Sequence, residues 1–327
     1  MRRREFITLL GGAAAFPALW PLAARAQQKI PVVGFLRSTS LAEFTHLKTA
    51  LRQGLKEAGF VEGQNVAVEY RSTEGQQERL PASVTDLIRL PVDIIVGDSI
   101  VALAAKAATT TVPVVFATGS DPVVRGLVAS LNRPGGNVTG VVFFSGNLGP
   151  KRLQQLRQFV PKATTIAVLV NPNLADTEAE RRDVLAAAQS IGQQLIVVDV
   201  SSERDIEAAF ATFVQRGAGA LLVGTGTFTN THRKGIIALA ARHALPASHP
   251  LREFVVEGGL MSYGASITDA YRQVGIYAGR ILKGEKPADL PVMRSDKIEF
   301  VINLKTAKTL GLEFHPQLLA TADEVIE

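Results

Sequence analysis

The stretches Ile30-Pro-Val-Val-Gly-Phe-Leu36 and Thr165-Ile-Ala-Val-Leu-Val170 open two similar halves of this 327-residue chain. Each opening is followed by a helical stretch, a second apolar strand, another helix and a third strand that ends in small residues. The third strands are Val92-Asp-Ile-Ile-Val-Gly97 and Ala218-Gly-Ala-Leu-Leu-Val-Gly224. Short apolar strands that alternate with helices are typical of parallel sheets covered on both faces. The sequence therefore predicts an α/β fold of two Rossmann-like lobes with parallel sheets and a cleft between them.

The predicted strands and helices recur in the same order in the two halves. In the first half, strands are predicted at 31–36, 65–70, 92–97, 113–117 and 138–143, and helices at 41–58, 77–89, 99–109 and 122–131. In the second half, strands are predicted at 165–170, 194–200, 219–224, 245–248 and 259–262, and helices at 176–191, 203–216 and 230–243. After Tyr263 the repetition ends, and the sequence predicts one more helix at 268–282 and a strand at 297–303.

Three stretches are expected to carry the chain from one lobe to the other. They are residues 144–150, 262–266 and 288–294. Three such segments allow a hinge, whereas a single linker would leave the lobes independent. We therefore assign residues 27–146 and 266–292 to the first lobe, and residues 147–265 and 293–327 to the second. The roughly 300 residues after position 26 suit two domains of ordinary size.

Residues 1–26 have the three zones of an export signal. Arg2-Arg3-Arg4 is the charged start, residues 6–22 are apolar or small, and Ala24-Arg25-Ala26 is a cleavage site before Gln27. The run Arg3-Arg4-Glu5-Phe6 also resembles the twin-arginine pattern, so export by either the Tat or the Sec route fits. A buried first helix is the alternative, but three adjacent arginines argue against it. We expect a cleavable signal peptide and an exported mature protein.

Composition narrows the class of protein further. The chain contains no cysteine, which excludes disulfides, thiolate metal sites, cysteine nucleophiles and lipid-modified cysteines. No apolar stretch after the signal approaches the ~20 residues of a membrane-spanning helix. Residues 1–26 hold four arginines and one glutamate, which leaves 31 Lys+Arg against 29 Asp+Glu, a net charge of +2. This balance argues against a nucleic-acid surface, and we expect a freely diffusing periplasmic monomer.

Ligands of open α/β sheets sit outside the carboxyl ends of the strands. In this chain the loops at those ends carry hydroxyl, amide, carboxylate and aromatic side chains. The candidate ligand-binding residues are Ser38, Thr39, Asp98, Ser99, Thr118, Asp121, Phe143, Asn171, Asn173, Thr225, Thr227, Phe228 and Tyr263. Four aromatic residues are expected to form a wall for an apolar part of the ligand: Phe143, Phe144, Phe228 and Tyr263.

Several of these residues have a structural alternative. Asp121 stands directly before Pro122, the order typical of a helix start, and we interpret it first as an N-cap. Asp98 precedes Ser99, which could cap the next helix instead and leave the carboxylate for a ligand ammonium group. Phe143 continues a strand and could pack in the core, whereas Tyr263 is expected to face the cleft.

The sequence lacks the usual motifs of enzymes. No Gly-x-Gly-x-x-Gly follows the first strand, and there is neither a phosphate-binding loop with Lys-Ser/Thr nor a Gly-x-Ser-x-Gly turn. The five histidines show no His-x-x-x-His or His-x-His spacing, which argues against a metal site. We therefore expect a protein that is not an enzyme and needs no cofactor.

Five segments of the chain carry a resemblance to a known family. They are Phe116-Ala-Thr-Gly-Ser-Asp-Pro-Val123, Gly126-Leu-Val-Ala-Ser-Leu-Asn-Arg-Pro-Gly-Gly-Asn-Val-Thr-Gly140, Leu169-Val-Asn-Pro-Asn173, Gly258-Gly-Leu-Met-Ser-Tyr-Gly264 and Phe300-Val-Ile-Asn-Leu-Lys-Thr-Ala-Lys-Thr-Leu-Gly-Leu312. Together they resemble the solute-binding proteins of ABC importers of the tryptophan-binding-protein type, over residues 29–320. The resemblance implies a type I periplasmic binding fold, an ABC permease as partner, and an amino-acid ligand that is often aromatic.

These observations predict the periplasmic solute-binding component of an ABC importer, which captures a small molecule by closure of two lobes about a three-segment hinge. The expected ligand is an amino acid with a ring or a branched side chain. One alternative is a periplasmic sensor with the same cleft that signals to a receptor. Another is a binder of a sugar or a purine.

Overall fold

The computed structural model describes residues 30–40, 45–143, 148–173, 177–314 and 316–327. The signal sequence expected at residues 1–26 lies outside this part of the chain. Residues Pro31–Glu327 form a single compact unit that contains two sheets. Among the described residues, no helix is both long enough and apolar enough to cross a membrane.

The first sheet has six strands, all of which run parallel to their neighbours. Their order across the sheet is β2 (Ala67–Ser72), β1 (Val32–Arg37), β3 (Ile94–Asp98), β4 (Val114–Thr118), β5 (Val138–Val142) and β11 (Met293–Arg294). The order reverses between β1 and β3, so the loops after these two strands diverge and leave a crevice at the carboxyl edge of the sheet.

The second sheet repeats this order and extends it. Its strands are β7 (Gln194–Asp199), β6 (Thr165–Val170), β8 (Ala220–Val223), β9 (Ala247–His249), β10 (Met261–Ala265), β12 (Ile298–Asn303) and β13 (Glu324–Ile326). Only the pair β10 and β12 is antiparallel among these described strands. The predicted α/β fold with two mostly parallel sheets is therefore confirmed.

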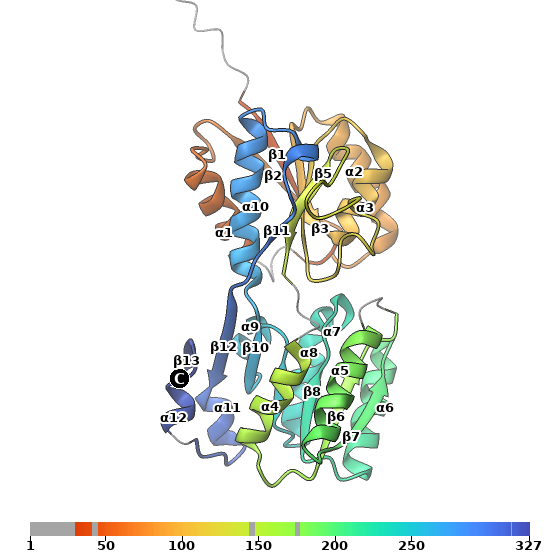
Figure 1. The fold of residues 1–327 in the computed structure, drawn as a ribbon, viewed down its shortest axis with the longest axis vertical. Coiled ribbons are helices and arrows are strands. Elements are labelled where there is room, and N and C mark those ends of the chain that lie inside the picture. The colour runs from red at the N-terminus through yellow and green to blue at the C-terminus, as the bar shows by residue number, and fades with distance from the viewer. Residues whose placement is uncertain (1–29, 41–44, 144–147, 174–176, 315) are drawn as a thin grey trace, which may run out of the picture. The chain divides into compact units, whose positions relative to one another are not determined.

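Helices cover both faces of the first sheet (Figure 1). On one face lie α1 (Thr45–Glu57) and α10 (Ile267–Leu282), and on the other lie α2 (Leu80–Arg89) and α3 (Ser99–Ala108). Burial on both faces explains the sequence of the central strands. The five residues of β4, for example, are all buried, and four of them are apolar.

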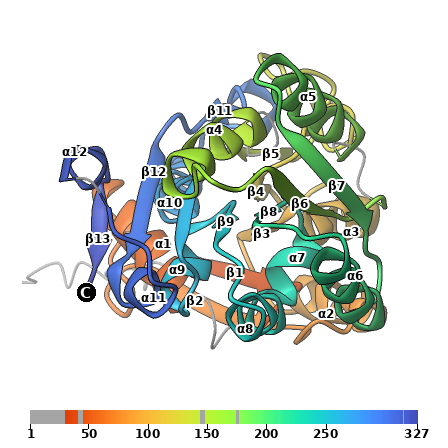
Figure 2. The ribbon, with the colours of Figure 1, turned by 90° about the horizontal axis from the view of Figure 1, so that it is seen from below.

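The second sheet is covered in the same manner (Figure 2). One face packs against α4 (Gly149–Phe159), α5 (Thr177–Ser190) and α11 (Leu304–Thr309), and the other packs against α6 (Glu203–Gln215), α8 (Arg233–Arg242) and α9 (Arg252–Val256). The remaining helices of the described chain are short: the α-helices α7 (Thr227–Thr231) and α12 (Pro316–Leu319), and the 3-10 helices η1 (Gln77–Arg79) and η3 (Pro287–Asp289).

The chain changes from one sheet to the other in three places. It does so between β5 and α4, between β10 and α10, and between β11 and β12. Residues 144–147 of the first stretch lie outside the described chain. Met293 and Arg294, assigned from the sequence to the second lobe, pair instead with β5 in the first sheet. The third change of sheet therefore falls at 295–297.

The helix predicted at 122–131 is wrong, because these residues form turns. Asp121 caps the first turn by accepting backbone N–H bonds at 2.8 and 3.2 Å. Gly126 then adopts a φ of +69°, and the Leu127 N–H bonds to the Pro122 carbonyl at 2.8 Å. This pattern closes a helix at its C-terminus, so the segment stops after one turn.

Candidate functional site

A pocket with about 960 Å³ of empty space, part of it open to solvent, lies within the compact unit of residues 31–327. The wall from the first sheet and α10 contains Arg37, Ser38, Thr39, Asp98, Ser99, Ala117, Thr118, Gly119, Ser120, Arg125, Phe143, Ile267 and Tyr271. The wall from the second sheet and its helices contains Thr177, Thr225, Gly226, Thr227, Asn230, Pro250 and Leu251.

The crevice between β1 and β3 is organised by Asp98. This residue caps α3, because its Oδ1 accepts the N–H bonds of Ile100 and Val101, both at 3.1 Å. Its Oδ2 accepts the backbone N–H of Ser38 at 3.0 Å and the Ser38 hydroxyl at 2.7 Å. The alternative in which Ser99 caps α3 and leaves Asp98 unpaired is therefore wrong. All four lone-pair positions of the carboxylate are in use.

A buried arginine and a tyrosine lie beside this carboxylate. Arg37 donates from Nη1 to the Tyr271 hydroxyl and from Nη2 to Thr39 Oγ1 at 2.9 Å. Burial alone would lower the pKa of Arg37, but Tyr271 and Asp98 outweigh it, and the pKa lies above its usual value. Burial raises the pKa of Tyr271 against the opposing effect of Arg37. The wall thus presents a charged guanidinium next to a neutral phenol.

The second sheet builds a similar arrangement around Thr225. Its backbone N–H and its hydroxyl donate to Glu180 Oε2 at 3.0 and 2.7 Å. The other oxygen of Glu180 accepts a hydrogen bond from Arg152 Nη2, and both of these residues are buried. Burial lowers the pKa of Arg152, although Glu180 opposes the shift. A buried ion pair therefore holds the pocket-lining loop after β8 in place.

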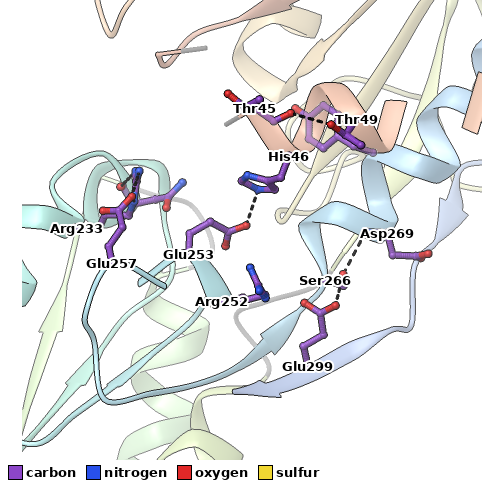
Figure 3. Close-up of polar contacts among 12 residues, drawn as sticks. Thr45, His46, Thr49, Arg233, Arg252, Glu253, Glu257, Ser266, Asp269 and Glu299 are labelled. Carbon is purple, nitrogen blue, oxygen red and sulfur yellow. Dashed lines mark hydrogen bonds and ion pairs between the residues drawn. The ribbon is translucent and has the colours of Figure 1, made fainter. Parts of the chain in front are cut away.

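Another polar contact joins helices that pack on different sheets (Figure 3). His46 on α1 points towards Glu253 on α9, with 2.8 Å between Nε2 and Oε1. Burial would raise the pKa of Glu253, but the hydrogen bond and charge interaction with His46 outweigh it and lower the pKa. Glu253 is therefore held as a carboxylate close to the pocket residue Leu251.

The described residues show no group of three or more His, Asp or Glu side chains placed to hold a metal ion. The pocket instead offers hydroxyl groups, backbone groups and two guanidinium groups, with an apolar section made by Phe143, Leu251, Ile267 and the Tyr271 ring. Such a wall can bind a small polar molecule that carries an apolar part.

The family model described as ABC transporter substrate binding protein matches residues 29–326. The chain belongs to this family. A curated relative is the tyrosine-binding protein of Clostridioides difficile (strain R20291), which is 24% identical over 267 residues, 81% of this chain and 76% of the relative. The family consists of solute-binding proteins and is not a class of enzymes.

Two solved structures place this substrate-binding protein among type I periplasmic binding proteins. An ABC domain in complex with L-Trp from Streptococcus pneumonia has a TM-score of 0.80 and 25% identity, and the match covers 90% of this chain and 99% of that one. A ligand-free, open structure of a substrate-binding protein with adhesive properties from Clostridium difficile has a TM-score of 0.68 and 23% identity, with 91% and 99% covered.

Eight of the thirteen candidate residues of the substrate-binding protein line the pocket. They are Ser38, Thr39, Asp98, Ser99, Thr118, Phe143, Thr225 and Thr227. All of them lie at or just after strand ends, as the topology of parallel sheets predicts. That these side chains contact the ligand stays a prediction.

The other five candidates lie away from the pocket wall. Asp121 caps the turn after β4, and Asn171 accepts the N–H of the exposed Asn173 at 2.9 Å. Phe228 packs on the core of the second sheet and contacts the His232 ring at 4.2 Å. Tyr263 packs against Phe300 on the opposite face of that sheet, so the expectation that it faces the cleft is wrong. Phe144 lies outside the described residues.

Several residues of the wall are not among the candidates predicted from the sequence. Arg37 is the last residue of β1, and Tyr271 lies in α10, more than 230 positions later in the chain. Arg125 lies in the segment that was predicted as a helix. An arginine at the end of a buried strand is itself a signal, because a buried charge needs partners, but the sequence does not name those partners.

Proposed function

We propose that this substrate-binding protein is the periplasmic component of an ABC importer and captures an amino acid with a ring or a branched side chain. The observation that carries the proposal is the pocket, which is lined by loops from both sheets and combines hydroxyl and charged groups with an apolar section. The relatives support the ligand class, since one is named for tyrosine and another was solved with L-Trp.

Capture is proposed to occur by closure of two lobes. Each lobe consists of one sheet with its helices, and the three segments at which the chain changes sheet form the hinge. A ligand that bridges groups of both lobes shifts the population towards the closed form. The contact between His46 and Glu253 joins helices of the two lobes and belongs to this conformational equilibrium.

Export and delivery complete the proposal. The charged, apolar and small-residue zones of residues 1–26 are proposed to direct export through the Tat or the Sec route, after which the signal is removed. The closed form is then the one that the ABC permease recognises.

A thermal-shift screen of residues 27–327 tests the ligand class. The common L-amino acids are compared with a set of sugars and a set of purines. Saturating ligand stabilises the folded state by about 2.7 kcal/mol at a hundredfold excess over Kd, so a ring-bearing or branched amino acid is expected to raise the melting temperature. A rise caused by a sugar or a purine, with no response to amino acids, would contradict the proposal.

Two matched variants show whether the response comes from the pocket. Thr227→Trp places a large side chain at a pocket-lining position of α7, and Thr231→Trp places the same side chain at an exposed position of the same helix. The first variant is expected to lose the thermal shift and the second to keep it. Equal shifts in both variants would place the ligand elsewhere.

A further inference from the structure

Arg125 stands out among the charged groups of the pocket wall. It lies in the turn after β4 and lines the pocket. Its Nε is buried and has no hydrogen-bond partner among the described residues. No ion pair or side-chain hydrogen bond joins Arg125 to any residue in the described part of the chain. A partly buried guanidinium without an opposite charge is costly, and a ligand anion would remove that cost.

The other charged groups of the wall already have hydrogen-bond partners among the described residues. Arg37 is held by Tyr271 and Thr39 beside the carboxylate of Asp98, which uses both of its oxygens for Ser38 and the start of α3. Among the described residues of the wall there are thus two guanidinium groups and one carboxylate. The positive charge that remains is that of Arg125.

Nearby carboxylates behind the wall do not supply the missing partner. Glu180 accepts hydrogen bonds from Thr225 and forms an ion pair with Arg152. Glu253 contacts His46. Asp121, in the same turn as Arg125, caps Val123 and Val124 through Oδ1. None of these described carboxylates forms an ion pair with Arg125, which leaves its guanidinium open to a ligand anion.

The neutral groups of the wall define the rest of the ligand. The hydroxyl groups of Ser38 and Thr225 donate their hydrogens to carboxylates, so their oxygens remain as acceptors. An ammonium group would therefore meet hydroxyl oxygens and the Asp98 carboxylate, whose lone pairs are already in use. A carboxylate would meet the positive charge of Arg125, which has no hydrogen-bond partner for Nε among the described residues. Phe143, Leu251 and Ile267 offer an apolar surface to the ligand's side chain.

We propose that Arg125 is the specificity-determining residue of the pocket and pairs with the ligand's carboxylate, so that the protein selects a carboxylic acid with an apolar side chain. The α-ammonium group then contributes less to affinity than the carboxylate does. This inference rests on the proposed function and adds which end of the ligand is recognised by charge.

Matched compound sets test the inference by isothermal titration calorimetry. The sets are tryptophan, tryptamine and indole-3-lactate; tyrosine, tyramine and 4-hydroxyphenyllactate; and leucine, isoamylamine and 2-hydroxyisocaproate. Within the set that binds, loss of the carboxylate is expected to weaken binding about 30-fold or more, and loss of the ammonium group less. An amine that binds as tightly as its amino acid would overturn the inference while leaving solute capture intact. Absence of binding by every compound would overturn the proposed amino-acid function as well.

Variants locate the effect at Arg125. Arg125→Gln is expected to weaken the binding of the compounds that carry a carboxylate about 30-fold and to leave the affinity for the amine almost unchanged. Arg89→Gln is the control, since Arg89 is an exposed arginine of α2 outside the pocket. Melting of the unliganded variants verifies that both remain folded. If Arg125→Gln binds the acid as tightly as Arg89→Gln does, the assignment of Arg125 is wrong.

Discussion

Asp98 and Glu180 play equivalent structural roles in the two halves of the molecule. Each carboxylate accepts both a backbone N–H and a hydroxyl from one residue of the pocket wall, Ser38 in the first half and Thr225 in the second. Charge-assisted hydrogen bonds of this kind are stronger than neutral ones. The loops that would meet a ligand are therefore held in position before it arrives, which lowers the entropic cost of binding.

His249 provides a prediction about pH. Its ring is fully buried and lies 4.7 Å from the Phe254 ring, and neither ring nitrogen has a hydrogen-bond partner among the described residues. Burial, with a smaller effect of Arg152, lowers the pKa of His249 to about 3. In the unfolded chain the pKa is about 6.5, so the unfolded state binds a proton first as the pH falls. The contribution of His249 to the free energy of unfolding is therefore fully present well above pH 6.5. As the pH falls below 6.5, the free energy of unfolding decreases, by about 2 kcal/mol at pH 5.

Urea denaturation at pH 7 and pH 5 measures this effect. His249→Gln should lose about 2 kcal/mol less than the unmodified protein between the two pH values. His243→Gln is the control, because His243 is exposed at the end of α8. If His249→Gln and His243→Gln lose the same amount, His249 does not carry the pH dependence.

For single residues, the sequence predicts where a side chain lies better than it predicts which residues that side chain contacts. Ser38 and Thr225 could be placed at the pocket because residues after parallel strands gather at one edge of a sheet. The roles of Arg37 and Arg125 could not be predicted. The role of Arg37 depends on its contact with the distant Tyr271, and that of Arg125 depends on a turn in a segment for which the sequence predicts a helix. The prediction for Tyr263 is wrong because the side chains of a strand alternate between faces. Tyr263 lies on the same face of the sheet as Phe300, its register partner on β12.

Among the helices, α1 and α10 pack unusually closely. A Cβ atom added at Gly54 would lie 1.8 Å from the Arg272 carbonyl oxygen, and one added at Gly275 would lie 2.3 Å from the Leu51 carbonyl oxygen. Glycine is thus required at both positions, so that the two backbones can approach each other. The close pair covers one face of the first sheet and places Tyr271 in the pocket wall.

Substitution of glycine by alanine is expected to change the stability in opposite directions at two helical positions, Gly54 and Gly235. Gly54→Ala should lower the free energy of unfolding by about 2 kcal/mol or more, because the added methyl group forces the helices apart. Gly235→Ala in α8 meets nothing within 4 Å and should raise it by up to about 1 kcal/mol through helix propensity. Urea denaturation of both variants gives the comparison. A stable Gly54→Ala protein would show that the two helices are not tightly packed.

The elements themselves were predictable where local signals agree with the fold. The apolar runs that form β1, β3, β6 and β8 stand out because central parallel strands are buried on both faces. By contrast, α4 was missed, since its sequence Gly149-Pro-Lys-Arg-Leu-Gln-Gln-Leu-Arg-Gln-Phe159 has few apolar residues. Its buried face includes Arg152 and Gln155, which a pattern based on apolar residues does not detect.

The two sheets of the molecule share one strand order. Both sheets have the same succession of five strands, β2-β1-β3-β4-β5 and β7-β6-β8-β9-β10, and the pocket wall draws on the carboxyl ends of strands from both. The resemblance of residues 29–320 to solute-binding proteins agrees with the family match over residues 29–326. The three changes of sheet are the geometric basis for the proposed hinge.

Small-angle X-ray scattering of residues 27–327, with and without saturating amounts of the amino acid that gives the largest thermal shift, tests lobe closure most directly. Capture between two hinged lobes predicts a smaller radius of gyration in the presence of that ligand, and no change for Thr227→Trp at the same concentration. A scattering curve that stays the same while calorimetry shows the pocket to be full would contradict closure.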